Sequence, residues 1–124
     1  MTRILLVDDN ESFRTPLRSV LERAGYEVQV ADEGRSALNL YQEQPFDLVI
    51  TDLIMPGKEG LETIMELRQF QPGPKVIAMS GGGRMDASDY LPMAKRLGAT
   101  ETLAKPFTAD EILKLIRRVL SQTG

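Results

Sequence analysis

The sequence predicts an α/β fold, a doubly wound sandwich with roughly five parallel strands in one sheet and helices on both faces. Short apolar runs alternate with longer amphipathic stretches along the whole chain. This alternation is typical of parallel strands joined by right-handed helical crossovers. The chain has 124 residues, enough for one sizeable core, and no linker, repeat or low-complexity tract divides it. We therefore expect a single domain over residues 1–124.

The strands are expected in five short segments rich in apolar and β-branched residues: Arg3–Val7, Tyr26–Val30, Asp47–Thr51, Lys75–Met79 and Thr100–Ala104. The third and fourth segments are almost continuously apolar, as expected for strands that helices cover on both faces. If the strand order is 2-1-3-4-5, the first and third strands lie side by side.

The segments between the strands carry the helical period of 3.6 residues. It is clearest in two apolar sets: Phe13, Leu17, Val20, Leu21 and Ala24, and Ile112, Leu115, Ile116 and Val119. Gly25 and Gly98 each follow a basic-ended helix, so we expect left-handed C-terminal caps there. Thr108–Glu111 reads as a capping box that opens the last helix.

Two prolines modify this pattern. Pro16 lies about one turn into the first predicted helix, and we expect it to bend that helix or delay its regular start. Pro92 indicates that the helix before Gly98 begins late, near Asp89, after a long loop. That loop contains Gly81–Gly83, the segment with the greatest expected backbone freedom.

The composition narrows the chemistry that is possible. The chain has no cysteine and no histidine, which excludes disulfides, thiolate catalysis and any protein histidine as base, nucleophile or metal ligand. The net charge of −3 gives no general attraction for nucleic acid or an anionic membrane. No apolar run is long enough to span a bilayer, and no signal-peptide pattern opens the sequence. We expect a cytoplasmic protein that binds neither nucleic acid nor membrane directly.

Carboxylates gather at the predicted strand ends. Asp8 and Asp9 directly follow the first strand, and Asp52 directly follows the third. Ligands of doubly wound folds bind outside the carboxyl ends of the strands, so these three side chains are expected to converge. Three anionic oxygens describe a Mg²⁺ site, and the cation would offset the repulsion between the carboxylates. Paired aspartates at a strand end can also simply cap the next helix, as Asp9 or Asn10 could do here.

The other strand ends add complementary groups. Ser80 follows the fourth predicted strand with a hydroxyl, and Lys105 follows the fifth with a positive charge suited to a phosphate oxygen. Together with the carboxylates they form the equipment for phosphoryl transfer, in which catalysis is mostly positioning and charge neutralisation. Because the chain offers no histidine or cysteine, a carboxylate is the natural nucleophile, and the product would be an aspartyl phosphate.

These residues resemble the receiver domain of bacterial two-component response regulators, in the form of a chemotaxis-regulator-like single-domain receiver. The resemblance covers the whole chain through the motifs ILLVDDN, DLVITDLIMPGKEG, KVIAMSGGG and LAKPF, in this order at successive strand ends. It implies one receiver domain over residues 1–124 with a flavodoxin-like three-layer sandwich and a five-stranded parallel sheet of order 2-1-3-4-5.

Carried over by position, the resemblance implies a role for each residue of the set. Asp52 matches the phosphoacceptor, Ser80 the switch hydroxyl and Lys105 the phosphate-binding lysine, and the bond from Lys105 to Pro106 is expected to be cis. Mg²⁺ is the implied cofactor, and its expected ligands are Asp8, Asp9, Asp52 and the backbone carbonyl of Ile54. Within the acidic pair, Asp9 is expected to be the more direct ligand.

The implied function is that of a signalling phosphoacceptor rather than an enzyme. A sensor histidine kinase or phosphotransfer protein would donate a phosphoryl group from its phosphohistidine to Asp52. The new charge would draw Ser80 and Lys105 inward and shift a pre-existing equilibrium in the surface that binds a downstream protein target of unknown identity. A stand-alone receiver and a segment of a larger regulator or hybrid kinase both fit the sequence.

Three features depart from the family pattern. Thr102 stands three residues before the lysine, where the family usually has an aromatic residue, so the usual coupling between hydroxyl and ring is in question. We expect the Gly-rich segment Gly81–Asp89 to be the main moving element instead. Ile54 and Gly82 occupy the positions that flank an attacking water, and neither side chain can orient water, so we expect slow self-dephosphorylation.

Three other functions compete with this one. A Mg²⁺-dependent aspartyl phosphatase would need a second acid where Asn10 stands, and usually a cap domain for which 124 residues leave no room. A nucleotide-binding module would need glycines in the first strand-to-helix turn, which reads Asp-Asp-Asn. A receiver that binds partners without phosphorylation is the third alternative. The complete set of strand-end residues speaks against it.

Overall fold

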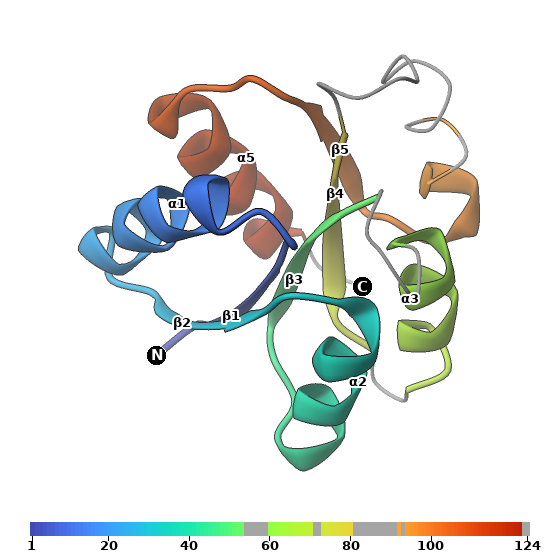
Figure 1. The fold of residues 1–124 in the computed structure, drawn as a ribbon. Helices are drawn as coiled ribbons and strands as arrows, with labels where there is room; N and C mark the ends of the chain where they lie inside the picture. The colour runs from blue at the N-terminus through green and yellow to red at the C-terminus, as the bar shows by residue number, and fades with distance from the viewer. Residues whose placement is uncertain (54–59, 71–72, 81–91, 93, 123–124) are drawn as a thin grey trace.

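The computed structural model describes residues 1–53, 60–70, 73–80, 92 and 94–122 (Figure 1). In this part of the chain, five strands form one parallel sheet of order β2-β1-β3-β4-β5, which confirms the predicted fold class and strand order. The strands are β1 Arg3–Val7, β2 Glu27–Ala31, β3 Leu48–Asp52, β4 Lys75–Ser80 and β5 Glu101–Ala104. Each strand end lies within one residue of its predicted position.

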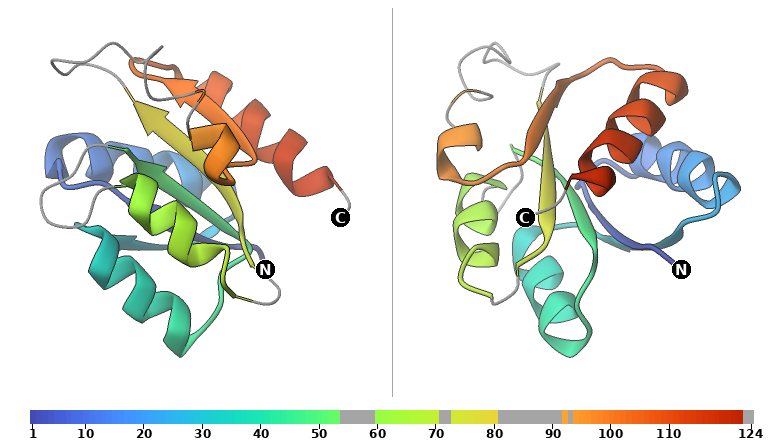
Figure 2. Two further views of the ribbon diagram at one scale, coloured as in Figure 1. Left: turned by 90° about the vertical axis from the view of Figure 1, so that its right-hand side faces the viewer. Right: turned by 180° about the vertical axis from the view of Figure 1, so that it is seen from behind.

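Helices cover both faces of the sheet (Figures 1 and 2). Helices α1 (Glu11–Arg23) and α5 (Ala109–Ser121) lie on one face, and α2 (Gly34–Glu43) and α3 (Gly60–Leu67) lie on the other. Residues 94–97 are also helical and lie on the α3 side. None of the helices in the described ranges is long and apolar enough to cross a membrane.

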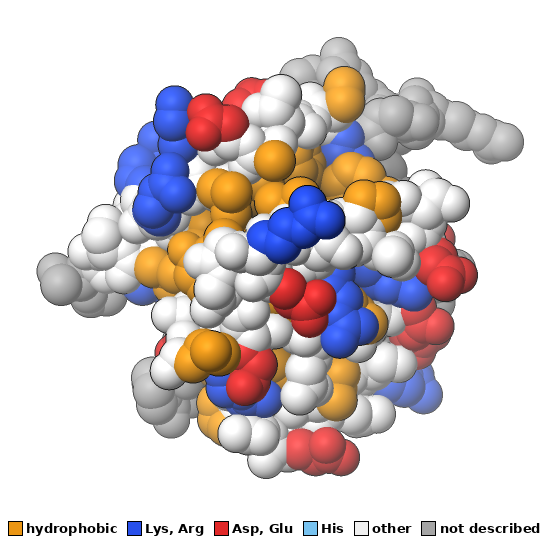
Figure 3. Space-filling model, turned by 90° about the vertical axis from the view of Figure 1, so that its left-hand side faces the viewer, with side chains coloured by type: hydrophobic (Ala, Val, Ile, Leu, Met, Phe, Trp, Pro, Cys, Tyr) orange, Lys and Arg blue, Asp and Glu red, His pale blue; other side chains and the backbone are white. Residues whose placement is uncertain are grey.

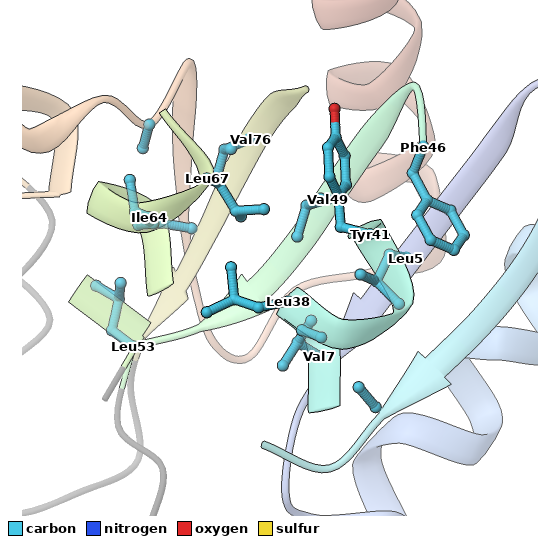
Figure 4. Packing of buried hydrophobic residues seen from close by; sticks show 14 of the residues in the cluster. Leu5, Val7, Leu38, Tyr41, Phe46, Val49, Leu53, Ile64, Leu67 and Val76 are labelled. Atoms are coloured by element: carbon cyan, nitrogen blue, oxygen red, sulfur yellow. The ribbon is translucent and has the colours of Figure 1, made fainter. Parts of the chain in front are cut away.

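Alternate side chains of each inner strand point to opposite faces of the sheet and pack into two separate hydrophobic layers. In β1, Ile4 and Leu6 pack with α1 and α5, whereas Leu5 and Val7 pack with α2 and α3, and all four are fully buried. Figure 4 shows the second layer, in which Leu5, Val7 and Val49 lie among side chains of α2 and α3. Both faces are therefore filled with apolar groups, and the strand ends are left as the place for polar side chains.

Local sequence signals set the helix ends. The Asn10 side chain accepts a hydrogen bond from the Phe13 N–H (3.3 Å) and caps α1. Thr108–Glu111 forms the predicted capping box at the start of α5. Gly25 and Gly98 have φ angles of +98° and +128°, which confirms the left-handed conformation expected at both positions.

Pro16 does not delay the start of α1, so that part of the prediction was wrong. The helix begins at Glu11 and continues through Pro16 to Arg23. A proline inside a helix removes one backbone donor, but the first turn here is already secured by the Asn10 cap. The predicted start of a helix near Asp89 lies outside the described residues.

A close backbone approach joins α3 to the end of β3. The Gly60 N–H donates to the Leu53 carbonyl (3.1 Å). A Cβ atom at Gly60 would lie 2.1 Å from the Asp52 carbonyl oxygen and 2.6 Å from the Leu53 Cα. Glycine is therefore required here by space, and it fixes the backbone that carries Asp52.

We expect Gly60→Ala to lower the free energy of unfolding by about 3 kcal/mol or more, because the backbone at the end of β3 would have to move. Gly25→Ala is the matched control. Its added Cβ would meet nothing within 4 Å, and only the φ of +98° would cost about 1–2 kcal/mol. Chemical denaturation of both variants makes the comparison. Equal losses in the two variants would contradict the role assigned to Gly60.

Candidate functional site

The carboxyl edge of the sheet brings four predicted side chains together. Asp8 follows β1, Asp52 ends β3, Ser80 ends β4 and Lys105 follows β5. Backbone hydrogen bonds hold these positions where the strands end: Asp8 N–H to Ala31 (3.1 Å), Leu53 N–H to Met79 (3.0 Å) and Lys105 N–H to Ser80 (2.7 Å). The bond between Lys105 and Pro106 is cis, as expected.

Three carboxylates form the acidic part of the site. Asp8, Asp9 and Asp52 each offer an oxygen, and these oxygens lie within 4.8 Å of one another. Asp8 is fully buried, Asp52 is 8% exposed and Asp9 is exposed. Mg²⁺ takes oxygen ligands from a small number of carboxylates and keeps several waters, so this donor set fits the expected cofactor. Ile54, whose carbonyl is a further expected ligand, lies outside the described residues.

Lys105 bridges two of the carboxylates. Its Nζ lies 2.9 Å from Asp8 Oδ2 and 3.6 Å from Asp52 Oδ1. The second Asp8 oxygen accepts a hydrogen bond from the Asn10 N–H (2.9 Å), and Asp52 Oδ1 accepts one from the Leu53 N–H (3.0 Å). Charge-assisted hydrogen bonds of this kind fix the orientation of both carboxylates.

Burial raises the pKa of Asp52 from 3.8 to about 6. The Lys105 charge and the Leu53 N–H lower this pKa, whereas the negative charges of Asp8 and Asp9 raise it further. Desolvation therefore outweighs the ammonium beside it. A carboxylate perturbed by burial and by specific charges, at the ligand-binding edge of such a fold, is a candidate for chemistry.

Ser80 contributes a buried hydroxyl that lacks a partner. The residue is 1% exposed, and its Oγ has no hydrogen-bond partner among the described residues. Buried hydroxyl groups normally have one, so the Ser80 hydroxyl is available to an acceptor that enters the site.

Three further side chains support the site and were not assigned to it from the sequence. The ring centroid of Phe13 lies 4.1 Å from Lys105 Nζ, and Phe107 meets that ring edge-on at 5.6 Å. The Arg14 guanidinium donates to the Asp8 carbonyl oxygen (2.7 Å). The helical period places Phe13 in the core. Its position in the first turn after the acidic pair is the signal that could have identified it.

Of the positions that depart from the family pattern, the structure describes Thr102 but not the Gly-rich segment. Thr102 is half-buried in β5 and pairs in register with Ala78 of β4, so a threonine side chain stands three residues before Lys105. Gly81–Asp89, including Gly82, lies outside the described residues.

We predict that Asp52→Asn stabilises the metal-free protein at neutral pH. The folded-state pKa of Asp52 is about 6 and its ordinary value is 3.8. The folded state therefore binds more protons between about pH 4 and pH 6, and stability falls as the pH rises through that window. Removing the carboxyl group should give a gain of about 1–3 kcal/mol near pH 7.5 that shrinks toward pH 4.

Urea denaturation in the presence of a chelator at several pH values measures this gain. Asp110→Asn, which changes an exposed carboxylate of α5, is the matched control and should show no comparable gain. A stability difference between Asp52→Asn and wild type that is the same at both ends of the pH range would refute the prediction.

Comparison with known proteins places this chain in a family. A family model described as response regulator receiver domain matches residues 4–117. The transcriptional regulatory protein CpxR of Escherichia coli (strain K12) is 35% identical over 123 residues, which cover 99% of this chain and 51% of CpxR. The protein CcdB of Bacillus subtilis (strain 168) is 35% identical over 121 residues, covering 97% and 98% of the two chains. The chain thus spans about half the length of CpxR but nearly all of CcdB.

Solved structures give the same assignment. The chemotaxis response regulator CheY4 of Vibrio cholerae has a TM-score of 0.85 at 33% identity, over 96% of this chain and 98% of that chain. A putative response regulator from Chloroflexus aurantiacus J-10-fl has a TM-score of 0.90 at 29% identity, over 98% of both chains. Because the family model matches residues 4–117 of the 124 in this chain, the chain belongs to the receiver domains of two-component response regulators.

Proposed function

We propose that this chain is the phosphoacceptor of a two-component system and that Asp52 is the residue that takes the phosphoryl group. The donor is the phosphohistidine of a sensor histidine kinase or a phosphotransfer protein. The observation that carries this proposal is the placement of one ammonium, Lys105 Nζ, within 2.9 Å of Asp8 and 3.6 Å of Asp52 at the carboxyl edge. That geometry provides a nucleophile and a counter-charge for phosphoryl oxygens in one place.

In the transfer step, an Asp52 carboxylate oxygen attacks phosphorus and the new P–O bond forms. The P–N bond of the donor breaks, and its electron pair returns to the nitrogen of the donor histidine. Lys105 neutralises charge on the phosphoryl oxygens, and the Ser80 hydroxyl donates a hydrogen bond to one of them. Asp8, Asp9 and Asp52, with the carbonyl of Ile54, would hold Mg²⁺, which supplies further charge neutralisation when it is bound. The chain thereby assists its own phosphorylation, and later its dephosphorylation, without being an enzyme that acts on another molecule.

The output of this reaction is a change in the protein-binding surface. The Ser80 hydroxyl has no hydrogen-bond partner among the described residues, so it can donate to a phosphoryl group on Asp52. The Lys105 ammonium is paired with Asp8, and the phosphoryl group would compete with Asp8 for it. Differential contacts of that kind shift an equilibrium between two states. The downstream partner in this proposal is a protein, and the expected location is the cytoplasm. CpxR, of which this chain matches about half, is named a transcriptional regulatory protein. Our prediction that the protein does not contact nucleic acid therefore applies only to residues 1–124.

Intact-mass measurement after incubation with a small phosphodonor and Mg²⁺ tests the acceptor. We expect wild type to gain one base-labile phosphoryl group, and Asp52→Asn or the metal-free protein to gain none. Asp110→Asn is the matched control and should react as wild type does. A phosphoryl group on Asp52→Asn would move the acceptor to another residue. No reaction and no Mg²⁺ binding by wild type would leave a receiver that acts without phosphorylation.

Lys105→Met tests the counter-charge. Loss of the ammonium should slow phosphorylation by about 10²-fold, comparable to the loss of one preorganised donor to a developing anion. Lys95→Met is the control, because Lys95 is exposed and pairs with Glu101 away from the site (3.5 Å). The two variants are compared by the rate of phosphoryl gain at saturating Mg²⁺. Equal rates would remove Lys105 from the mechanism.

A further inference from the structure

Lys105 carries its charge on a flexible four-carbon stem, so its position depends on the groups around the ammonium. Two of those groups are the carboxylates of Asp8 and Asp52. The third is the ring of Phe13 in the first turn of α1, with its centroid 4.1 Å from Nζ. This distance is well inside the range in which an aromatic face attracts a cation.

The Phe13 ring is itself held in place. Phe107 stands at 90° to it with the ring centroids 5.6 Å apart, an edge-to-face contact that aromatic pairs favour. The backbone of Phe13 is fixed by the Asn10 cap, which accepts from the Phe13 N–H. Both rings are partly buried against the core layer between α1 and α5, where hydrophobic side chains gather on the face seen in Figure 3. The ring therefore has little freedom to leave the ammonium.

We propose that Phe13 is a positioning residue for phosphoryl transfer, which holds the Lys105 ammonium beside Asp52 through the face of its ring. The inference rests on the proposed role of Asp52 as phosphoacceptor. It deepens that role by assigning a function to a residue outside the charged set.

A neutral ring is well suited to this task. An ammonium has three N–H donors, and carboxylates at Asp8 and Asp52 are the acceptors already beside it. A third carboxylate in place of Phe13 would also hold the cation, but it would use a donor and cancel the charge that phosphoryl oxygens need. The ring attracts the cation without accepting a conventional hydrogen bond from it, and the charge remains available to an incoming phosphoryl group.

The competing explanation is that Phe13 only fills the core between α1 and α5. Two variants separate the explanations. Phe13→Leu keeps an apolar side chain but removes the ring face, whereas Phe13→Tyr keeps the ring. Phe46→Leu is the matched control, because Phe46 also lies beneath a cation, Arg3, at 4.3 Å from the ring centroid. Phe46 precedes β3, at the opposite edge of the sheet from the site.

The first measurement is the NMR spectrum of the Lys105 side chain in the metal-free protein, assigned by its loss in Lys105→Met. Protons held over a ring face are shifted upfield by the ring. We expect this shift in wild type and Phe13→Tyr, and its loss in Phe13→Leu but not in Phe46→Leu. Ordinary lysine chemical shifts for the Lys105 methylene protons in wild type would overturn the proposal. This result would count whatever the phosphorylation experiments show.

The second measurement is the rate of phosphorylation by the small phosphodonor with Mg²⁺. We expect Phe13→Leu to react about 3- to 10-fold more slowly and Phe13→Tyr to recover most of the rate. In a Lys105→Met background, Phe13→Leu should have no additional effect, because the ring acts through the ammonium. The same loss in both backgrounds would mean that the ring has only a structural role. A wild type that keeps the upfield shift but gains no phosphoryl group would contradict the proposed function and leave the ring contact intact.

Discussion

The contact on which the site depends is the ammonium of Lys105 between the carboxylates of Asp8 and Asp52. Asp8 is fully buried and Asp52 nearly so, and two such anions repel each other in a poorly hydrated place. One cation reduces that repulsion for both. It does not remove the cost of burial, because the pKa of Asp52 is still raised to about 6. Buried ion pairs contribute little to stability on balance, so this arrangement is better explained by its chemistry than by folding.

The parallel topology explains how these groups meet. Asp8 and Lys105 are 97 positions apart in the chain, yet their side chains are in contact. In a parallel sheet every strand ends at the same edge, so the end of each apolar run delivers a polar side chain to one place. The pairing of β4 with β5 continues to this edge. Ser80 pairs with Ala104, and the N–H of the next residue, Lys105, donates to the Ser80 carbonyl. The hydroxyl and the ammonium that our proposed function assigns to one phosphoryl group are therefore joined through the backbone.

The sequence was sufficient for the fold and for the polar side chains at the strand ends, because both follow from repeated patterns. Apolar runs bounded by polar residues locate the strands, and the residue after each run locates Asp8, Asp52, Ser80 and Lys105. The sequence was not sufficient where one local signal competes with another. Pro16 reads as a helix breaker, but the Asn10 cap secures the first turn ahead of it. Phe13 fits the helical period as a core residue, and only the packing shows that its face meets Lys105.

Two unfavourable features of the site point to the same ligand. Asp52 is desolvated, and the Ser80 hydroxyl is buried without a partner among the described residues, which costs about 1–3 kcal/mol for a group of this kind. The Lys105 charge and the Leu53 N–H offset only part of the cost at Asp52, and no described residue offsets the cost at Ser80. A group attached to Asp52 that carried several anionic oxygens would accept from Ser80 and would give Lys105 a further partner. A phosphoryl group has this form. Because the two apolar layers supply the stability of the domain, the carboxyl edge can retain these costs, as our proposed function requires.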